Sequence, residues 1–142
     1  MKRDLSAYPG VVVDTGVWIE YFSETKLGQK FKEKIVEDRI SIYISETAVS
    51  EIFYVLCRQN GYQEAEKNIN RVLDGAEVIE GRGIQMFAGK YKCERAISLS
   101  DCFTIAVSKS MGFPALFKEE EEISKEIKKK AFDVEIFFLE DI

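Results

Sequence analysis

Carboxylates are the side chains of this chain that are best placed to do chemistry. The sequence contains no histidine, which excludes Ser-His-Asp and Cys-His catalysis, histidine acid–base chemistry and most zinc sites. Asp14 closes the apolar run 11–13, and Asp101 follows the segment 97–99 and Ser100. At both places a buried strand is predicted to lead through an aspartate into a helix. Because parallel strands share one carboxyl edge, the two carboxylates are predicted to lie together.

Two glutamates are further candidates for the same edge. Glu119 follows the predicted strand 115–117, within a run of one lysine and four glutamates at 118–122. Glu51 lies about two turns into a helix predicted after Ser45. On a helical wheel it lies beside an apolar stripe. The stripe consists of Ala48, Val49, Ile52, Phe53 and Leu56.

Each of these residues also has an ordinary structural explanation. Asp14 can cap the helix that follows it, because aspartate is a preferred N-cap residue. Asp101 and Glu119 can stabilise the positive end of a helix dipole from its first turn. Glu51 can be a solvated residue on the flank of its helix that interacts with Arg58. The repeated arrangement at Asp14 and Asp101 is what favours a shared site over these alternatives.

Carboxylates held close together repel, and some take up protons at neutral pH unless a cation lies among them. Oxygen ligands without histidine or a thiolate pattern favour Mg²⁺ or Mn²⁺. Such an ion can activate one of its waters for attack on phosphorus. The residues therefore predict metal-dependent phosphoryl or phosphodiester chemistry, without naming a substrate.

Composition limits the class of protein. The chain has 142 residues, of which 46% are hydrophobic, and this suits a single domain over 1–142 with its own core. A net charge of −5 argues against a broad basic surface for nucleic acid. Cys57, Cys93 and Cys102 have no CxxC spacing and predict neither a disulfide framework nor a zinc site.

No membrane segment is expected. The longest apolar runs fall well short of the roughly 18 residues that a membrane-spanning helix needs. The charged start at 1–4 leads into no apolar stretch of the kind found in secretory signals. We therefore expect a cytoplasmic protein.

Hydrophobic periodicity and turn residues predict strands and helices that alternate along the chain. The predicted strands are 10–14, 40–44, 76–79, 97–99, 115–117 and 134–139. The predicted helices are 18–22, 24–38, 45–60, 63–73, 84–95, 100–111 and 119–130. Alternation of this kind predicts the α/β class, as a three-layer α/β/α fold with a mainly parallel central sheet.

Three segments resemble the motifs of PIN-domain nucleases, especially the VapC-type toxins of prokaryotic toxin–antitoxin pairs. Residues 12–22, VVDTGVWIEYF, resemble the opening motif of that family. Residues 44–52, ISETAVSEI, resemble the second motif, in which the glutamate is a metal ligand. Residues 99–106, LSDCFTIA, resemble the third, in which the aspartate is a ligand. The resemblance covers about residues 10 to 140, in the expected order.

The resemblance implies an endoribonuclease that uses Mg²⁺ or Mn²⁺, held by Asp14, Glu51 and Asp101. Thr15 would orient the metal-bound water or a carboxylate through its hydroxyl. Glu119 is the best positional match to a fourth acidic residue. The implied partners are an RNA substrate, a small antitoxin and a second copy of the chain in a homodimer.

One motif departs from the family pattern. The fourth motif is usually Thr or Ser, any residue, then Asp, whereas this chain has Phe117-Lys118-Glu119. The hydroxyl is lost and the carboxylate is one methylene longer. The alternative to a nuclease is therefore a non-catalytic PIN-fold module that binds RNA or protein. A receiver-type domain is disfavoured because the first strand lacks a neighbouring acidic pair, and a DxD phosphatase because Gly16 occupies the second acidic position.

Overall fold

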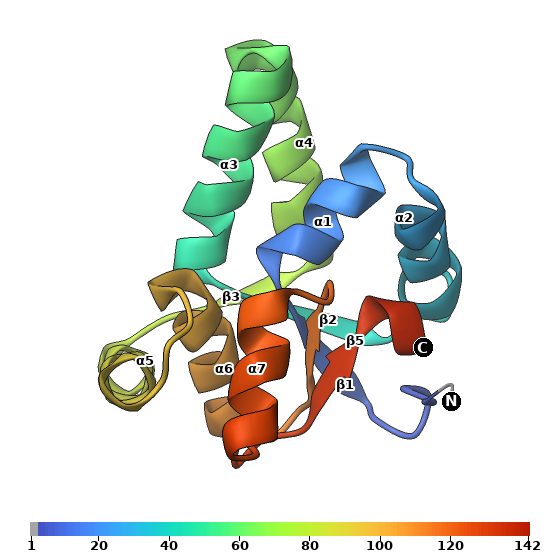
Figure 1. Ribbon diagram of the computed structural model, residues 1–142. Coiled ribbons are helices and arrows are strands. Elements are labelled where there is room, and N and C mark those ends of the chain that lie inside the picture. The colour runs from blue at the N-terminus through green and yellow to red at the C-terminus, as the bar shows by residue number, and fades with distance from the viewer. Residues whose placement is uncertain (1–2) are drawn as a thin grey trace.

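A computed structural model describes residues 3–142 and shows a five-stranded parallel sheet between two layers of helices (Figure 1). The sheet order is β3-β2-β1-β4-β5, so the first strand lies at the centre. The strands are β1 (Gly10–Val13), β2 (Ser41–Ser45), β3 (Glu77–Ile79), β4 (Ala115–Phe117) and β5 (Ile136–Phe138). The predicted three-layer α/β fold is confirmed.

Alternation along β1 divides the core into two halves. Val11 and Val13 pack on one face of the sheet and Val12 on the other, because successive side chains of a strand point in opposite directions. On the Val11 side lie α1 (Thr15–Phe22), α2 (Lys26–Phe31), α3 (Glu46–Asn60) and α4 (Tyr62–Gly75). On the Val12 side lie α5 (Arg82–Glu94), α6 (Leu99–Met111) and α7 (Glu121–Lys129).

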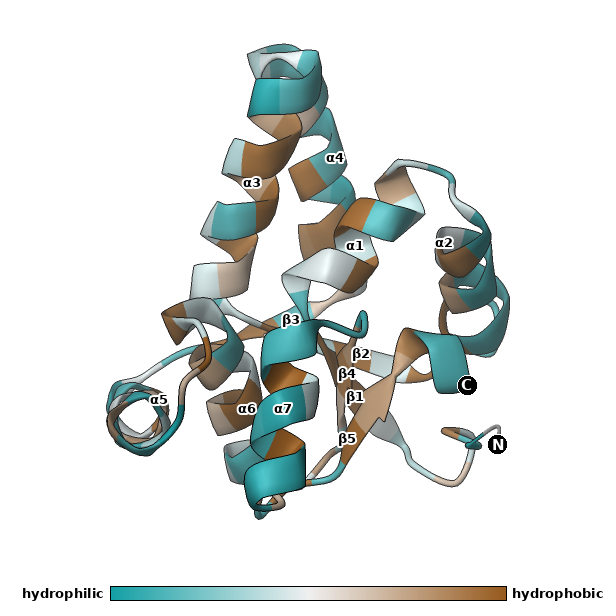
Figure 2. Cartoon of the chain, in the orientation of Figure 1, coloured by the Kyte–Doolittle hydropathy of each residue, from teal (hydrophilic) through white to brown (hydrophobic). Residues whose placement is uncertain are grey.

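Helices α3 and α4 form an antiparallel arm that stands beyond the carboxyl edge of the sheet (Figure 1). The Ser45 hydroxyl caps α3 by accepting the Ala48 N–H at 3.0 Å. Gly61 separates the two helices with φ of 89°, a value that L-residues rarely adopt. Hydrophobic bands on the two helices face each other along the arm (Figure 2). The helix predicted over 45–60 is confirmed.

Three predicted elements differ from the structure. No strand forms at 97–99, because Ser98 instead caps α6 and accepts the Asp101 N–H at 3.1 Å. The predicted helix 24–38 begins only at Lys26, after the Thr25 cap, and relaxes into a π-helical turn at Lys32–Val36. Helix α7 begins at Glu121 rather than 119, which leaves residues 118–120 outside regular structure. Within residues 3–142, no helix is long and apolar enough to cross a membrane.

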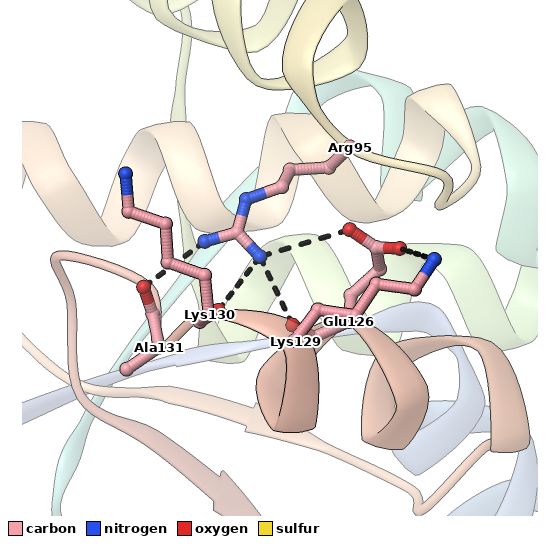
Figure 3. A network of polar contacts seen from close by, with 5 residues as sticks. All are labelled: Arg95, Glu126, Lys129, Lys130 and Ala131. Carbon is pink, nitrogen blue, oxygen red and sulfur yellow. Dashed lines mark hydrogen bonds and ion pairs between the residues drawn. The ribbon is translucent and has the colours of Figure 1, made fainter.

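Arg95, the residue that follows α5, contacts the end of α7 (Figure 3). Its guanidinium donates hydrogen bonds to the backbone carbonyls of Glu126 (3.1 Å), Lys130 (2.8 Å) and Ala131 (3.0 Å). It also lies 3.7 Å from the Glu126 carboxylate and 3.9 Å from the centre of the Phe132 ring. The three carbonyls lie in the last turn of α7 and directly after it, so one largely buried side chain holds this end of the helix.

Replacement of this side chain tests its contribution to stability. We expect Arg95→Met to lower the free energy of unfolding by about 1–2 kcal/mol, since leaving carbonyl acceptors without their donor costs roughly 1–3 kcal/mol. Urea unfolding followed by the fluorescence of buried Trp18 measures the change. The matched control is Lys125→Met, which removes an exposed ion pair to Glu121 and should cost about 0.5 kcal/mol or less. Equal losses in the two variants would contradict the assignment.

Candidate functional site

The candidate site lies at the carboxyl ends of β1 and β4. The chain leaves β1 toward β2 on one side and later returns to β4 on the other side of β1. In open parallel sheets this reversal creates a crevice where ligands bind. Figure 1 shows the first turns of α1, α3, α6 and α7 converging above this edge of the sheet.

Asp14 is the central residue of the site. It is only 3% exposed, and its backbone N–H donates to the Leu116 carbonyl, which extends the β1–β4 pairing to the last residue before α1. Asp14 occupies the N-cap position of α1, but its side chain makes no capping hydrogen bond. Its Oδ1 instead accepts from the Thr104 hydroxyl at 2.8 Å. Capping by the side chain is therefore not the explanation for Asp14.

Asp101 approaches the same point from α6. It lies in the first turn of that helix and is 5% exposed. Because no strand forms at 97–99, Asp101 does not repeat the local arrangement of Asp14, although that repetition was the basis for pairing the two. Close packing of α6 onto β1 brings it there instead, and the Thr104–Asp14 hydrogen bond marks this contact.

Burial and like charges raise the proton affinity of both aspartates. The pKa of Asp14 lies well above its usual range, chiefly because the group is buried and secondly because Asp101 is negative. The pKa of Asp101 is raised to about 7, first by burial and then by the charge of Glu120, with a smaller contribution from Glu51. The electrostatic field thus links four carboxyl groups from four different segments of the chain.

Glu51 reaches the cluster from α3. It is partly buried, and its Oε1 accepts from the Ser100 hydroxyl at 3.1 Å. Among the described residues it forms no ion pair, and Arg58 instead lies 5.0 Å from the centre of the Tyr54 ring. The alternative in which Glu51 pairs with Arg58 on a solvated helix flank is not what the structure contains.

The structure brings Glu120, rather than Glu119, toward the other three carboxylates. Both glutamates are exposed, but the Glu119 Oε1 accepts from Ser124 at 3.4 Å and the Glu119 N–H donates to Glu140 at 3.0 Å. Glu120 has an extended backbone, with φ of −132° and ψ of 146°. Neighbouring side chains in extended chain point to opposite sides. The charge of Glu120 raises the pKa of both Asp14 and Asp101.

Sequence reasoning missed three residues of this region. Ser100 and Thr104 are one turn apart on α6, and each donates its hydroxyl to a carboxylate that comes from another element. Glu120 was hidden inside a run of four glutamates. The hydroxyls carried one usable signal, since both follow the i, i+4 spacing on the helix that also holds Asp101.

The donor set fits a hard divalent cation. All the candidate ligands are carboxylate oxygens, and the buried Thr15 hydroxyl beside Asp14 has no hydrogen-bond partner in the structure. Within residues 3–142, no three carboxylate or thiol groups converge closely enough to form a complete cage. Mg²⁺ does not need such a cage, because it is commonly held by one or two carboxylates and keeps several waters.

Comparison with known families assigns the chain. The sequence model of the PIN domain matches residues 11–129. Since this match spans most of the sequence, the chain belongs to the PIN domain family. Among curated proteins, none matches the chain by sequence.

Solved structures of the same fold include several toxin proteins. DNA-bound VapBC from Salmonella typhimurium superimposes with a TM-score of 0.73 and 12% identity, covering 92% of this chain and 98% of the other. VapC20 from Mycobacterium tuberculosis is described as a toxin that cleaves the sarcin-ricin loop. It superimposes with a TM-score of 0.66 and 18% identity, covering 82% of this chain and 94% of the other. VapBC-1 from Haemophilus influenzae superimposes with a TM-score of 0.66 and 14% identity, covering 92% of this chain and 98% of the other. At these identities the similarity shows the fold alone.

The raised pKa of Asp101 predicts how stability depends on pH without metal. Between about pH 4 and about pH 7 the folded protein binds more protons than the unfolded chain, whose Asp pKa is 3.8. The free energy of unfolding should therefore fall as pH rises through this window. Asp101→Asn should flatten this dependence. It should also raise the melting temperature above pH 7 by several degrees, at roughly 2–4 °C per kcal/mol.

Thermal melts in a chelating buffer across this range measure the effect. Asp74→Asn on the exposed surface of α4 is the matched control, and it should follow the wild-type curve. A wild-type melting temperature that rises between about pH 4 and about pH 7 would contradict the electrostatic description of the cluster.

Proposed function

We propose that this protein is a metal-dependent endoribonuclease that hydrolyses phosphodiester bonds of RNA. The observation that carries the proposal is the buried pair Asp14 and Asp101, which share the field of Glu51 and Glu120 at the reversal point of a PIN-domain sheet. Membership of the family supports hydrolysis of nucleic acid. The description of VapC20 as a cleaving toxin supports RNA as the substrate class.

We propose that Mg²⁺ or Mn²⁺ binds among Asp14, Asp101, Glu51 and Glu120, held directly by one or two of these carboxylates and through its waters by the others. Glu120 takes the fourth place in this proposal, since Glu119 faces Ser124. When bound, the ion would supply a water of lowered pKa as the nucleophile and would stabilise charge on the phosphate. Its charge would also relieve the repulsion that raises the pKa values of the two aspartates.

The chain's own residues position these ligands. Thr104 donates to one oxygen of Asp14, and Ser100 donates to one oxygen of Glu51. Each hydrogen bond restrains the carboxylate and leaves its second oxygen available. Thr15, whose hydroxyl has no hydrogen-bond partner in the structure, is proposed to orient a water or a carboxylate at the site. Fixing ligand geometry in this way lets a site bind and react without reorganising.

The biological setting that we propose is a toxin–antitoxin pair. Similar folds occur in the VapBC structures from Salmonella typhimurium and Haemophilus influenzae, whose names denote toxin–antitoxin complexes. We propose that a small antitoxin holds this protein inactive, that the protein forms a homodimer, and that it acts on RNA in the cytoplasm. We also propose that residues 1–142 form a single domain.

A non-catalytic module that binds RNA or protein is the second candidate function. Lys118 favours it, because an ammonium beside the carboxylates opposes the binding of a cation. A module of this kind would bind its partner but would not cleave RNA, whichever metal ion is added.

Cleavage of RNA tests the proposal directly. With Mg²⁺ or Mn²⁺, wild type should cut single-stranded RNA, and EDTA should stop the reaction. Asp14→Asn and Asp101→Asn should each lower kcat at least a hundredfold, because each removes a charged ligand. Glu120→Gln should lose more activity than Glu119→Gln, which is its neighbour in the same run. Gel analysis of labelled RNA measures all four variants, with Asp74→Asn as the surface control.

Two outcomes would contradict this proposal. Activity that survives EDTA would exclude the metal, and full activity in both aspartate variants would exclude the site. A larger loss in Glu119→Gln than in Glu120→Gln would return the fourth ligand to Glu119.

Thr104 provides a test of metal binding that needs no turnover. Thr104→Val keeps the shape of the side chain but removes the donor to Asp14. We expect it to weaken Mn²⁺ binding by about 10–100-fold, the usual cost of losing a partner of a metal ligand. Electron paramagnetic resonance of free Mn²⁺ measures the affinity. Ser110→Ala, exposed on the same helix, should bind as wild type does. Unchanged affinity in Thr104→Val would exclude Asp14 from the metal shell.

A further inference from the structure

Lys118 places a positive charge at the rim of the acidic cluster. It is the first residue after β4, next to the point where β1 ends and Asp14 follows. Gly16 at the start of α1 lies beside it, because a Cβ there would be in ordinary contact with the Lys118 Cβ at 3.4 Å and with Glu120 Oε1 at 3.9 Å. The start of α1, Lys118 and Glu120 therefore share one small region.

The ammonium group of Lys118 is only loosely held. It pairs with Glu20 on α1 at 3.9 Å, which is near the limit of an ion pair. The Lys118 side chain is 40% exposed and that of Glu20 is 17% exposed. Within residues 3–142, no hydrogen bond from this ammonium to a backbone carbonyl or hydroxyl is formed, in contrast to Lys30 and Lys92. A pair of this length and exposure contributes little to stability.

Negative groups surround this ammonium. Glu20 lies 3.9 Å from it, and Glu120, two residues along the chain, is near enough to Asp14 for its charge to raise the Asp14 pKa. The positive charge of Lys118 lowers the pKa of Glu120, against the larger effects of burial and of Glu122. An RNA strand that approached this rim would meet carboxylates, which repel its phosphates.

We infer that Lys118 binds a phosphate group of the RNA next to the scissile bond and so positions the strand over the carboxylate cluster. This inference rests on the proposed function and adds a substrate contact to it. The ammonium exchanges its long contact with Glu20 for a phosphate oxygen. Lysine suits this role, because it is a compact charge on a flexible stem and needs no fixed geometry. Such contacts set the position of a strand and carry no sequence information.

The opposing explanation is that Lys118 only neutralises Glu120. The two explanations predict different measurements, because a phosphate contact affects RNA affinity and its dependence on salt. Neutralisation affects the affinity for the metal ion. Lys118→Met removes the charge and keeps most of the aliphatic stem, and Lys118→Arg keeps the charge.

RNA binding is measured by fluorescence anisotropy with a short labelled single-stranded RNA, in the Asp14→Asn background so that no strand is cut. Lys118→Met should weaken binding about tenfold, as expected for one charged contact. It should also reduce the slope of log affinity against log salt by about 0.7, the value for one phosphate on a single strand. Lys118→Arg should keep most of the affinity. Lys125→Met, on the exposed face of α7, should bind as the background does.

Cleavage kinetics and Mn²⁺ titration complete the test in the otherwise wild-type protein. Lys118→Met should raise KM about tenfold and should not weaken Mn²⁺ binding. Unchanged RNA affinity, salt slope and KM in Lys118→Met would overturn the inference, whereas RNA cleavage by wild type would still uphold the proposed function. Wild type that binds RNA but never cleaves it would refute the proposed function, and the anisotropy series would still decide the role of Lys118.

Discussion

Repulsion among buried carboxyl groups is the constraint around which this molecule is organised. Asp14 and Asp101 are both almost fully buried, and each lies in a field that favours its protonated form. Burying like charges lowers the free energy of unfolding unless protons or a cation compensate. The rest of the domain must therefore hold these groups against their repulsion. Sites in which the fold opposes local stability are characteristic of function.

Hydrogen bonding and packing supply that restraint from two sides. The β1–β4 pairing continues through the Asp14 backbone, and α6 lies against both strands with its Thr104 hydroxyl on the Asp14 carboxylate. The second hydroxyl of α6, on Ser100, holds Glu51 from the helical arm. One helix thus contributes Asp101 and the donors to two other carboxylates. Several of its apolar residues, among them Ile105 and Val107, are completely buried, so α6 cannot turn away to relieve the charge.

The sequence predicted the layers of this fold, but it did not predict how every residue comes to lie in the site. The apolar run Val11-Val12-Val13 is a local signal for a strand, and Ser45 and Gly61 are local signals for the two ends of a helix. The structure contains both the strand and the helix. Asp101 was placed beside Asp14 through a strand at 97–99 that does not form; its position comes instead from long-range packing of α6. The choice between Glu119 and Glu120 depends on where α7 begins. In a run of four glutamates, no local pattern fixes that boundary.

Lys118 shows that metal affinity and substrate affinity impose opposite demands on one position. A hydroxyl there would leave the cluster more negative and favour a bound cation, but it would offer a phosphate no charge. An ammonium weakens the field that attracts the cation and attracts the anionic strand instead. The lysine is 40% exposed, so water screens its effect on the buried aspartates. A phosphate that docks on it excludes part of that water, and the contact strengthens only in the complex. Exposure at the rim therefore lets one charge serve the substrate while it disturbs the buried cluster little.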